Sequence, residues 1–67
     1  KRNYFQLINE YRVREAKRIL LADGGKDPKI ITIAFDVGFN TLNSFNRAFK
    51  RHAGMTPTEF RKTHRSD

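Results

Sequence analysis

Amide and basic side chains recur at helical spacing between residues 41 and 52. On a helix with about 100° per residue, one side would carry Leu42, Asn43, Asn46, Arg47 and Lys50. Amide and guanidinium groups can form paired hydrogen bonds with base edges, and an ammonium group suits a phosphate. A polar helix face is most often only solvated. Whether this face contacts DNA or only solvent therefore depends on the elements that position these residues.

The opposite side of the same segment is apolar. It consists of Phe45, Ala48, Phe49 and His52. This stripe predicts a helix over about residues 42–52 that packs on a core, with Thr41 as its N-cap and Gly54 at its end. Ser44 and Arg51 lie on the borders between the two faces.

A shorter helix is expected just before it, within the segment 27–50. Asp27 is a suitable N-cap, and Pro28 is tolerated at the first helical position. The apolar residues recur at intervals of three and four, at Ile30, Ile33, Ala34 and Val37. Gly38 can adopt the positive φ of a tight turn. The pattern predicts a helix-turn-helix, which places its second helix in the major groove of DNA.

The longest predicted helix covers residues 3–22, with Asn3 as its N-cap. Its main apolar face consists of Phe5, Ile8, Val13, Ala16, Ile19 and Leu20. Arg12 lies in the middle of this face, where its methylenes could pack while its guanidinium reaches water. Alternatively it pairs with Asp36 or Glu59, and we favour the ion pair because an unpaired buried charge is costly.

A second apolar stripe on this helix consists of Tyr4, Leu7 and Tyr11. It lies roughly 100–120° from the main apolar face, and a small domain cannot easily cover both. These side chains are either ordinary exposed residues or a docking surface for a part of the protein that the chain lacks. The abrupt start of the sequence, KRNYF, favours docking.

Residues 56–59, Thr-Pro-Thr-Glu, have the pattern of a capping box that opens a short last helix. In this helix Phe60 is expected to pack inward, and Arg61 and Lys62 are expected to face solvent. Residues 63–67 are expected to fray.

The predicted fold is therefore all-α: a small helical domain with a long N-terminal linker helix, a helix-turn-helix and a short C-terminal helix. We divide it into the linker helix and its loop, residues 1–26, and the helix-turn-helix module with the last helix, residues 27–67. The Gly pair in the loop lacks the spacing of a phosphate-binding loop.

The composition favours a polyanionic partner. The 67 residues include 14 Lys and Arg against 7 Asp and Glu, so the net charge is +7. Such a basic small domain suits nucleic acid or an acidic membrane surface, but the basic residues of the first helix are spread around it, so we expect no membrane contact. There is no Cys, and the two His residues are far apart, so we expect no metal and no cofactor. The lack of Cys fits the cytoplasm.

No catalytic constellation is visible, and we expect no enzyme activity. Asp36 and Glu59 belong to separate elements without an adjacent base. His52 is expected to face the core, and His64 lies in the expected tail. The main alternative to DNA binding is a helical protein-interaction module that docks on polymerase or on another regulator domain.

Many residues at fixed spacing match a known family. They are Ile33, Ala34, Val37, Gly38, Phe39, Phe45, Arg47, Phe49, Lys50, Gly54, Thr56, Pro57, Phe60 and Arg61, preceded by Arg12, Ala16 and Leu20. This pattern, over about residues 4–62, resembles the signature of the AraC/XylS-type bacterial transcription regulators. The family's DNA-binding unit has two helix-turn-helix modules joined by a long central helix. The resemblance implies that the chain holds the central helix and the second module, and that the first module covers the Tyr4–Leu7–Tyr11 stripe.

The resemblance also implies residue roles. The base-reading residues would be Leu42, Asn43, Asn46 and Arg47, and the residues beside the DNA backbone would be Thr41, Ser44, Lys50 and Arg51. Structural roles would fall to Arg12, Ala34, Gly38, Phe39, Phe45, Phe49 and Pro57. Leu42 is apolar at a position where many family members carry a polar residue. It either contacts a thymine methyl group or lies at the edge of the DNA groove without contacting a base. Expected partners are double-stranded DNA, the missing first module and a sensor domain, with RNA polymerase as a further candidate.

Overall fold

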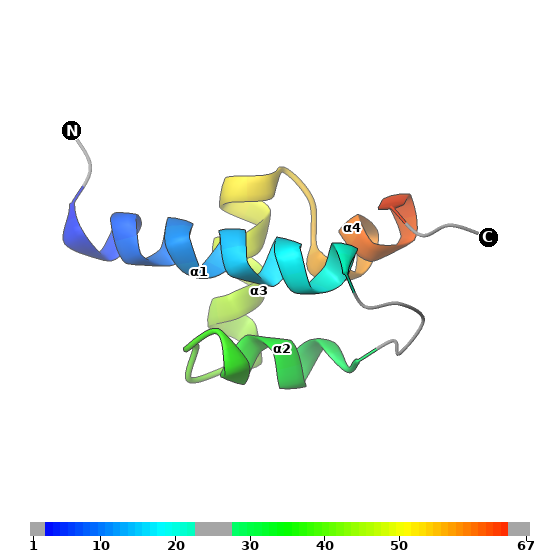
Figure 1. The fold of residues 1–67 in the computed structure, drawn as a ribbon. Coiled ribbons are helices and arrows are strands. Elements are labelled where there is room, and N and C mark those ends of the chain that lie inside the picture. Colours follow the sequence, from blue (N-terminus) through cyan, green and yellow to red (C-terminus); the bar gives the residue numbers. More distant parts are fainter. Residues whose placement is uncertain (1–2, 23–27, 65–67) are drawn as a thin grey trace.

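The computed structural model describes residues 3–22 and 28–64 of the chain. These residues form four helices and no strand, with bounds α1 (Tyr4–Leu21), α2 (Ile30–Asp36), α3 (Leu42–Ala53) and α4 (Pro57–His64). Figure 1 shows α1 crossing in front of α3, with α2 below the crossing and α4 to the right, near the C-terminal end of α1. The predicted all-α fold with a long first helix and a short last helix is confirmed.

The predicted N-cap of α1 is confirmed. Asn3 Oδ1 accepts a hydrogen bond from the Gln6 backbone N–H at 2.8 Å, and Gln6 Oε1 accepts one from the Asn3 N–H at 3.3 Å. This reciprocal capping box satisfies two backbone donors that the first turn would otherwise leave without partners.

The first half of α1 packs less than predicted. Its buried residues are Val13, Ala16 and Leu20. Phe5, which was expected to face the core, is 76% exposed, and Ile8 is only partly buried. In Figure 1 the first turns of α1 extend beyond α3, with no other helix beside them. Helical periodicity predicts which face of a helix is apolar, but not how far along it the neighbouring helices reach.

The start of α2 also differs from the prediction. The helix begins at Ile30, its N-cap is Lys29 without a side-chain hydrogen bond, and Pro28 lies outside it. Arg61, which was expected to face solvent, is partly buried, and its guanidinium donates a hydrogen bond to the Pro28 carbonyl oxygen. This bond ties the Pro28 carbonyl to α4. The predicted cap Asp27 lies outside the described residues.

The turn between α2 and α3 depends on Gly38, whose φ is 110°. The Gly38 N–H donates to the Phe35 carbonyl at 3.1 Å, and the Phe39 N–H donates to the Ala34 carbonyl at 2.9 Å. The predicted N-cap Thr41 is confirmed, because its Oγ1 accepts from the Ser44 N–H at 3.0 Å. The turn and this cap together fix where α3 begins.

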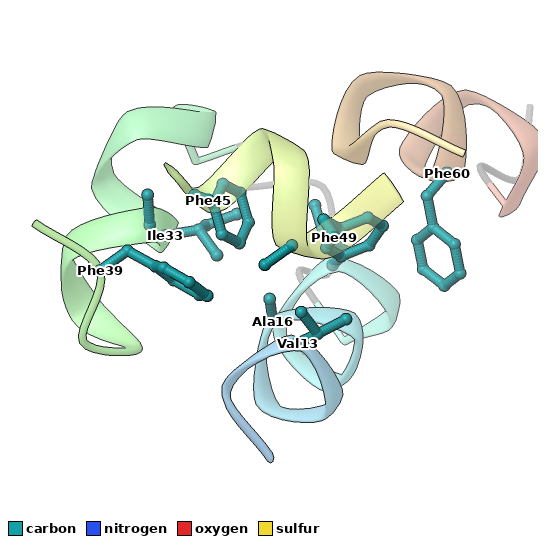
Figure 2. Close-up of a cluster of buried hydrophobic side chains, with 10 residues drawn as sticks. Val13, Ala16, Ile33, Phe39, Phe45, Phe49 and Phe60 are labelled. Atoms are coloured by element: carbon teal, nitrogen blue, oxygen red, sulfur yellow. The ribbon is translucent and has the colours of Figure 1, made fainter. Parts of the chain in front are cut away.

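A chain of aromatic rings holds α3 against its neighbours (Figure 2). The ring centroids of Phe39 and Phe45 lie 5.4 Å apart, those of Phe45 and Phe49 5.7 Å apart, and those of Phe49 and Phe60 5.5 Å apart. These rings join the turn, α3 and α4, while Val13 and Ala16 approach from α1. Because this side of α3 is fully packed, its opposite side is left free for other contacts.

The capping box predicted for α4 is confirmed. The Thr56 N–H donates to Glu59 Oε1 at 2.9 Å, and the Glu59 N–H donates to Thr56 Oγ1 at 3.2 Å. The hydrogen bonds from Thr56, with a smaller effect of the Lys50 charge, lower the pKa of Glu59 below its ordinary value of 4.5. His64, which was expected to be frayed, lies in the last turn of α4, and its Nδ1 is 2.9 Å from the Phe60 carbonyl oxygen.

The ion pair expected for Arg12 is not formed. The guanidinium contacts neither Asp36 nor Glu59 and instead lies over the Phe39 ring, 5.4 Å from its centroid. Arg12 is only partly buried and Asp36 is exposed, so the desolvation that would make an ion pair necessary is incomplete. Across residues 3–22 and 28–64, no helix has the length and apolar character needed to cross a membrane.

Candidate nucleic-acid interface

The outward side of α3 carries most of the residues predicted to contact bases. Asn43 and Arg47 are exposed, Leu42 is 36% exposed, and Asn46 is partly buried. They point outward because Phe45, Ala48 and Phe49 turn the other side of the helix into the core. Lys50 is exposed one turn after Asn46. The amide and basic groups therefore share one accessible helix face.

The N-terminus of α3 is suited to an anion. The helix has 12 residues and no acidic residue in its first turn, and its partial positive charge points toward the turn at Gly38. Thr41 Oγ1 accepts a hydrogen bond from Ser44, so the Thr41 hydroxyl hydrogen is left to donate outward. Both side chains are exposed at the place where a phosphate could approach.

Basic residues follow at the other end of α3, where Lys50, Arg51 and His52 occupy the last turn. Two ion pairs lie on α1, between Glu10 and Arg14 at 4.0 Å and between Glu15 and Arg18 at 3.1 Å. Arg47 and Arg51 form no ion pair with another described residue. Their positive charge is therefore available to an external anion.

A groove of about 360 Å³ runs along one flank of α3, where α1 crosses it. Its lining includes Ser44, Arg47 and Arg51 from α3, and Gln6 and Asn9 from α1. Sequence reasoning missed Gln6 and Asn9. Their spacing of three places them on one side of a helix. Only the crossing of α1 over α3, which no local pattern predicts, brings that side to the candidate interface.

The residues considered for catalysis are dispersed. Asp36 ends α2, and Glu59 lies in α4. His52, which was expected to face the core, is partly buried and lines the groove. Within the described part of the chain, no group of three or more His, Cys, Asp or Glu side chains is placed to hold a metal ion.

Comparison with known proteins agrees with this geometry. Residues 1–63 match the helix-turn-helix domain family. The chain is 41% identical to the transcriptional activator RhrA of Rhizobium meliloti (strain 1021) over 51 residues, covering 76% of this chain and 16% of that protein. It is 36% identical to an uncharacterized HTH-type transcriptional regulator in the cgkA 5' region of Pseudoalteromonas carrageenovora over 56 residues, covering 84% of this chain and 31% of that protein.

No solved structure matches the chain significantly. The chain spans less than a third of the length of either relative, at 16% and 31%. The family match, however, covers nearly all of it, including α1, α2, α3 and all but the last residue of α4. The chain thus belongs to the AraC/XylS-type helix-turn-helix family of transcription regulators.

Proposed function

We propose that this chain binds double-stranded DNA in a sequence-dependent way, as part of a bacterial transcription regulator, with α3 in the major groove. The observation that supports this most directly is the outward side of α3. It combines exposed amide and basic groups with a buried opposite side, and it begins at a tight glycine turn. A helix of about 10–12 Å diameter fits a major groove about 12 Å wide.

The base-reading roles fall to the outward side of α3. Asn43 and Asn46 are suited to paired hydrogen bonds with adenine, and Arg47 is suited to the two acceptors of guanine. Leu42, at the first turn and 36% exposed, would meet a thymine methyl group. Asn46 is partly buried, so it has less freedom to adapt than Asn43.

The backbone contacts fall to the two ends of α3. Thr41 and Ser44 lie at its positive N-terminus, where a phosphate is favoured by the helix dipole. Lys50 and Arg51 supply charge about two to three turns later. These contacts would hold the helix in register without reading sequence.

Two substitutions separate these roles. A preferred duplex is first selected from a randomised pool, and binding is then measured by fluorescence anisotropy on that duplex and on a random one. Arg47→Ala is expected to weaken binding to the preferred duplex by about 1–3 kcal/mol, with little effect on random DNA. Lys50→Ala is expected to weaken binding to both duplexes equally. It should also make the negative slope of log K against log salt less steep by about 0.9.

Arg14→Ala is the matched control, because it removes one positive charge from α1, where Arg14 is exposed and lies near Glu10. It should change binding to either duplex far less than Lys50→Ala. If Arg47→Ala loses the same binding free energy on preferred and on random DNA, Arg47 does not read a base. Failure of the unaltered chain to bind any duplex at low salt would favour the protein-interaction alternative.

A second proposal concerns the exposed apolar residues of α1. Tyr4 is 74% exposed, Leu7 53% and Tyr11 62%, with Phe5 beside them at 76%. We propose that another helix-turn-helix module of the same longer protein covers this stripe. Isolated exposed apolar residues are common, but four within two turns of one helix suggest an interface. The lengths of the relatives leave room for such a module.

This docking can be tested by replacing Tyr4, Leu7 and Tyr11 with Ser in the present chain and in a longer protein that contains a second module. The melting temperature should hardly change in the present chain, because these side chains are already exposed. It should fall in the longer protein. An equal effect in both would argue against the docking.

The remaining expectations stay predictions. They are a sensor domain and RNA polymerase as further partners, action in the cytoplasm, and binding without catalysis. DNA binding accounts for the exposed polar residues of α3 without any catalytic step, and in bacteria it takes place in the cytoplasm.

A further inference from the structure

The groove between α1 and α3 is lined mainly by groups that can donate hydrogen bonds. Two are the guanidinium groups of Arg47 and Arg51, and the others include Ser44 and the amides of Gln6 and Asn9. Among the residues that the structure describes, no acidic side chain lines this groove. Two other hollows both include Glu10; one is lined by α1 alone, and the other also includes His52 of α3. A groove with two guanidinium groups and no carboxylate favours an anionic ligand.

The two amides from α1 are available to such a ligand. Asn9 is partly buried, and its side chain forms no hydrogen bond with another described residue. Gln6 uses its Oε1 to accept from the Asn3 N–H, which leaves the amide N–H groups of its side chain free to donate. Both residues are held on the folded part of α1 rather than on a loop.

The position of the groove indicates which anion it meets. When a helix fills the major groove, the phosphates of the two DNA strands run along its two flanks. Arg47 belongs both to the outward side of α3 and to the lining of the groove, so the groove adjoins the base-reading face. The DNA strand on the α1 side would therefore pass over the groove.

We infer that this groove seats a backbone phosphate of the bound DNA, held by Arg51 and Asn9 with Gln6 beside them. This inference rests on the proposed function. It makes α1 a second DNA-contacting helix, in addition to its role in packing α3. The contact would add affinity on every sequence, because a phosphate carries no base information.

The test compares two substitutions that each add one negative charge to α1. Asn9→Asp places a carboxylate in the groove, whereas Tyr11→Asp places one on nearly the opposite side of the helix, at an exposed residue. Binding is measured by fluorescence anisotropy on a random duplex at about 50 mM salt. Asn9→Asp should raise Kd roughly tenfold, as expected when a hydrogen bond to a charged group is lost. Tyr11→Asp should change Kd less than twofold.

A third variant tests whether an added positive charge in the groove strengthens DNA binding. Asn9→Arg should tighten binding and steepen the slope of log K against log salt by about 0.9, because one more phosphate is neutralised. Circular dichroism of each variant checks that the helices are retained. If Asn9→Asp and Tyr11→Asp weaken binding equally, or if Asn9→Arg leaves the slope unchanged, the inference is overturned while the proposed function stands. If the unaltered chain binds no duplex, the proposed DNA-binding function and the inferred phosphate contact are both overturned.

Discussion

The guanidinium of Arg12, on α1, lies over the ring of Phe39, in the turn that precedes α3, with 5.4 Å between its central carbon and the ring centroid. Phe39 in turn packs on Phe45 of α3, whose ring centroid is 5.4 Å away. Arg12 thus connects the long helix to the one turn that determines where the candidate DNA-binding helix begins. A cation over an aromatic face is attracted by the ring's negative charge distribution, and the attraction grows as water is excluded.

Replacing Arg12 with Met should therefore destabilise the fold. The substitution retains an apolar stem of similar length but removes the cation, and it should lower the free energy of unfolding by about 0.5–2 kcal/mol. Urea unfolding followed by circular dichroism measures this. Arg14→Met is the control, because Arg14 is exposed on the same helix and has no aromatic partner among the described residues. Losses of the same size for both variants would mean that the contact with Phe39 contributes little.

Gly38 is expected to tolerate a side chain less well than Gly54. Both have positive φ, at 110° and 81°, so an Ala is strained at either position. At Gly38 an added Cβ would also lie 3.0 Å from Arg12 Nε, whereas at Gly54 nothing lies within 4 Å. Gly54→Ala should cost about 1–2 kcal/mol, and Gly38→Ala should cost more, toward about 3 kcal/mol.

A double-mutant cycle shows whether the extra destabilisation at Gly38 comes from Arg12. In an Arg12→Ala background, Gly38→Ala should cost about as much as Gly54→Ala, because the guanidinium no longer has to move. The measurement is again the free energy of unfolding in urea. If the Gly38→Ala cost is the same with and without Arg12, the backbone conformation alone is responsible.

Glu59 should make part of the stability depend on pH. Its pKa in the folded chain is lowered by the Thr56 hydrogen bonds and by Lys50. Glu59 therefore stabilises the fold above its ordinary pKa of 4.5, and this contribution is lost as the pH falls through the lowered value. Glu59→Gln keeps an oxygen that can accept the Thr56 N–H bond but does not titrate.

The comparison is made by urea unfolding at neutral pH and at a pH well below 4.5. The unaltered chain should be more stable than Glu59→Gln at neutral pH, and the difference should shrink in acid. Other carboxylates titrate in both proteins and cancel in the difference. A difference that stays constant with pH would mean that the Glu59 charge does not contribute.

Local sequence signals predicted the features that depend on neighbouring residues. Thr41 and the Thr56–Glu59 pair were recognisable as caps because a cap is formed within four residues. The aromatic stripe of α3 was recognisable from helical spacing and became its buried side. The outward side of α3, with Asn43 and Arg47, follows directly from that stripe.

The features that escaped prediction depend on how the helices meet in space. Phe5 has the right angular position for the core, but α3 does not reach that far along α1. Asn9 and Gln6 become part of the candidate interface only through the crossing of α1 over α3. Arg61 of α4 donates a hydrogen bond to the carbonyl of Pro28, which is 33 residues away in the sequence. None of these contacts has a short-range signature in the sequence.

The affinity of this chain for DNA should be low and strongly dependent on salt. Its charged candidates for phosphate contacts are Lys50 and Arg51, so log K should fall with log salt with a slope of about −2, or about −3 if Arg47 also contacts a phosphate. At physiological salt we expect Kd of roughly 10⁻⁴–10⁻⁶ M on random duplexes, because one helix-turn-helix supplies few contacts. Fluorescence anisotropy between about 50 and 200 mM salt measures both quantities. Nanomolar binding at physiological salt, or a slope near zero, would show that phosphate contacts by two or three basic residues of α3 do not describe this interface.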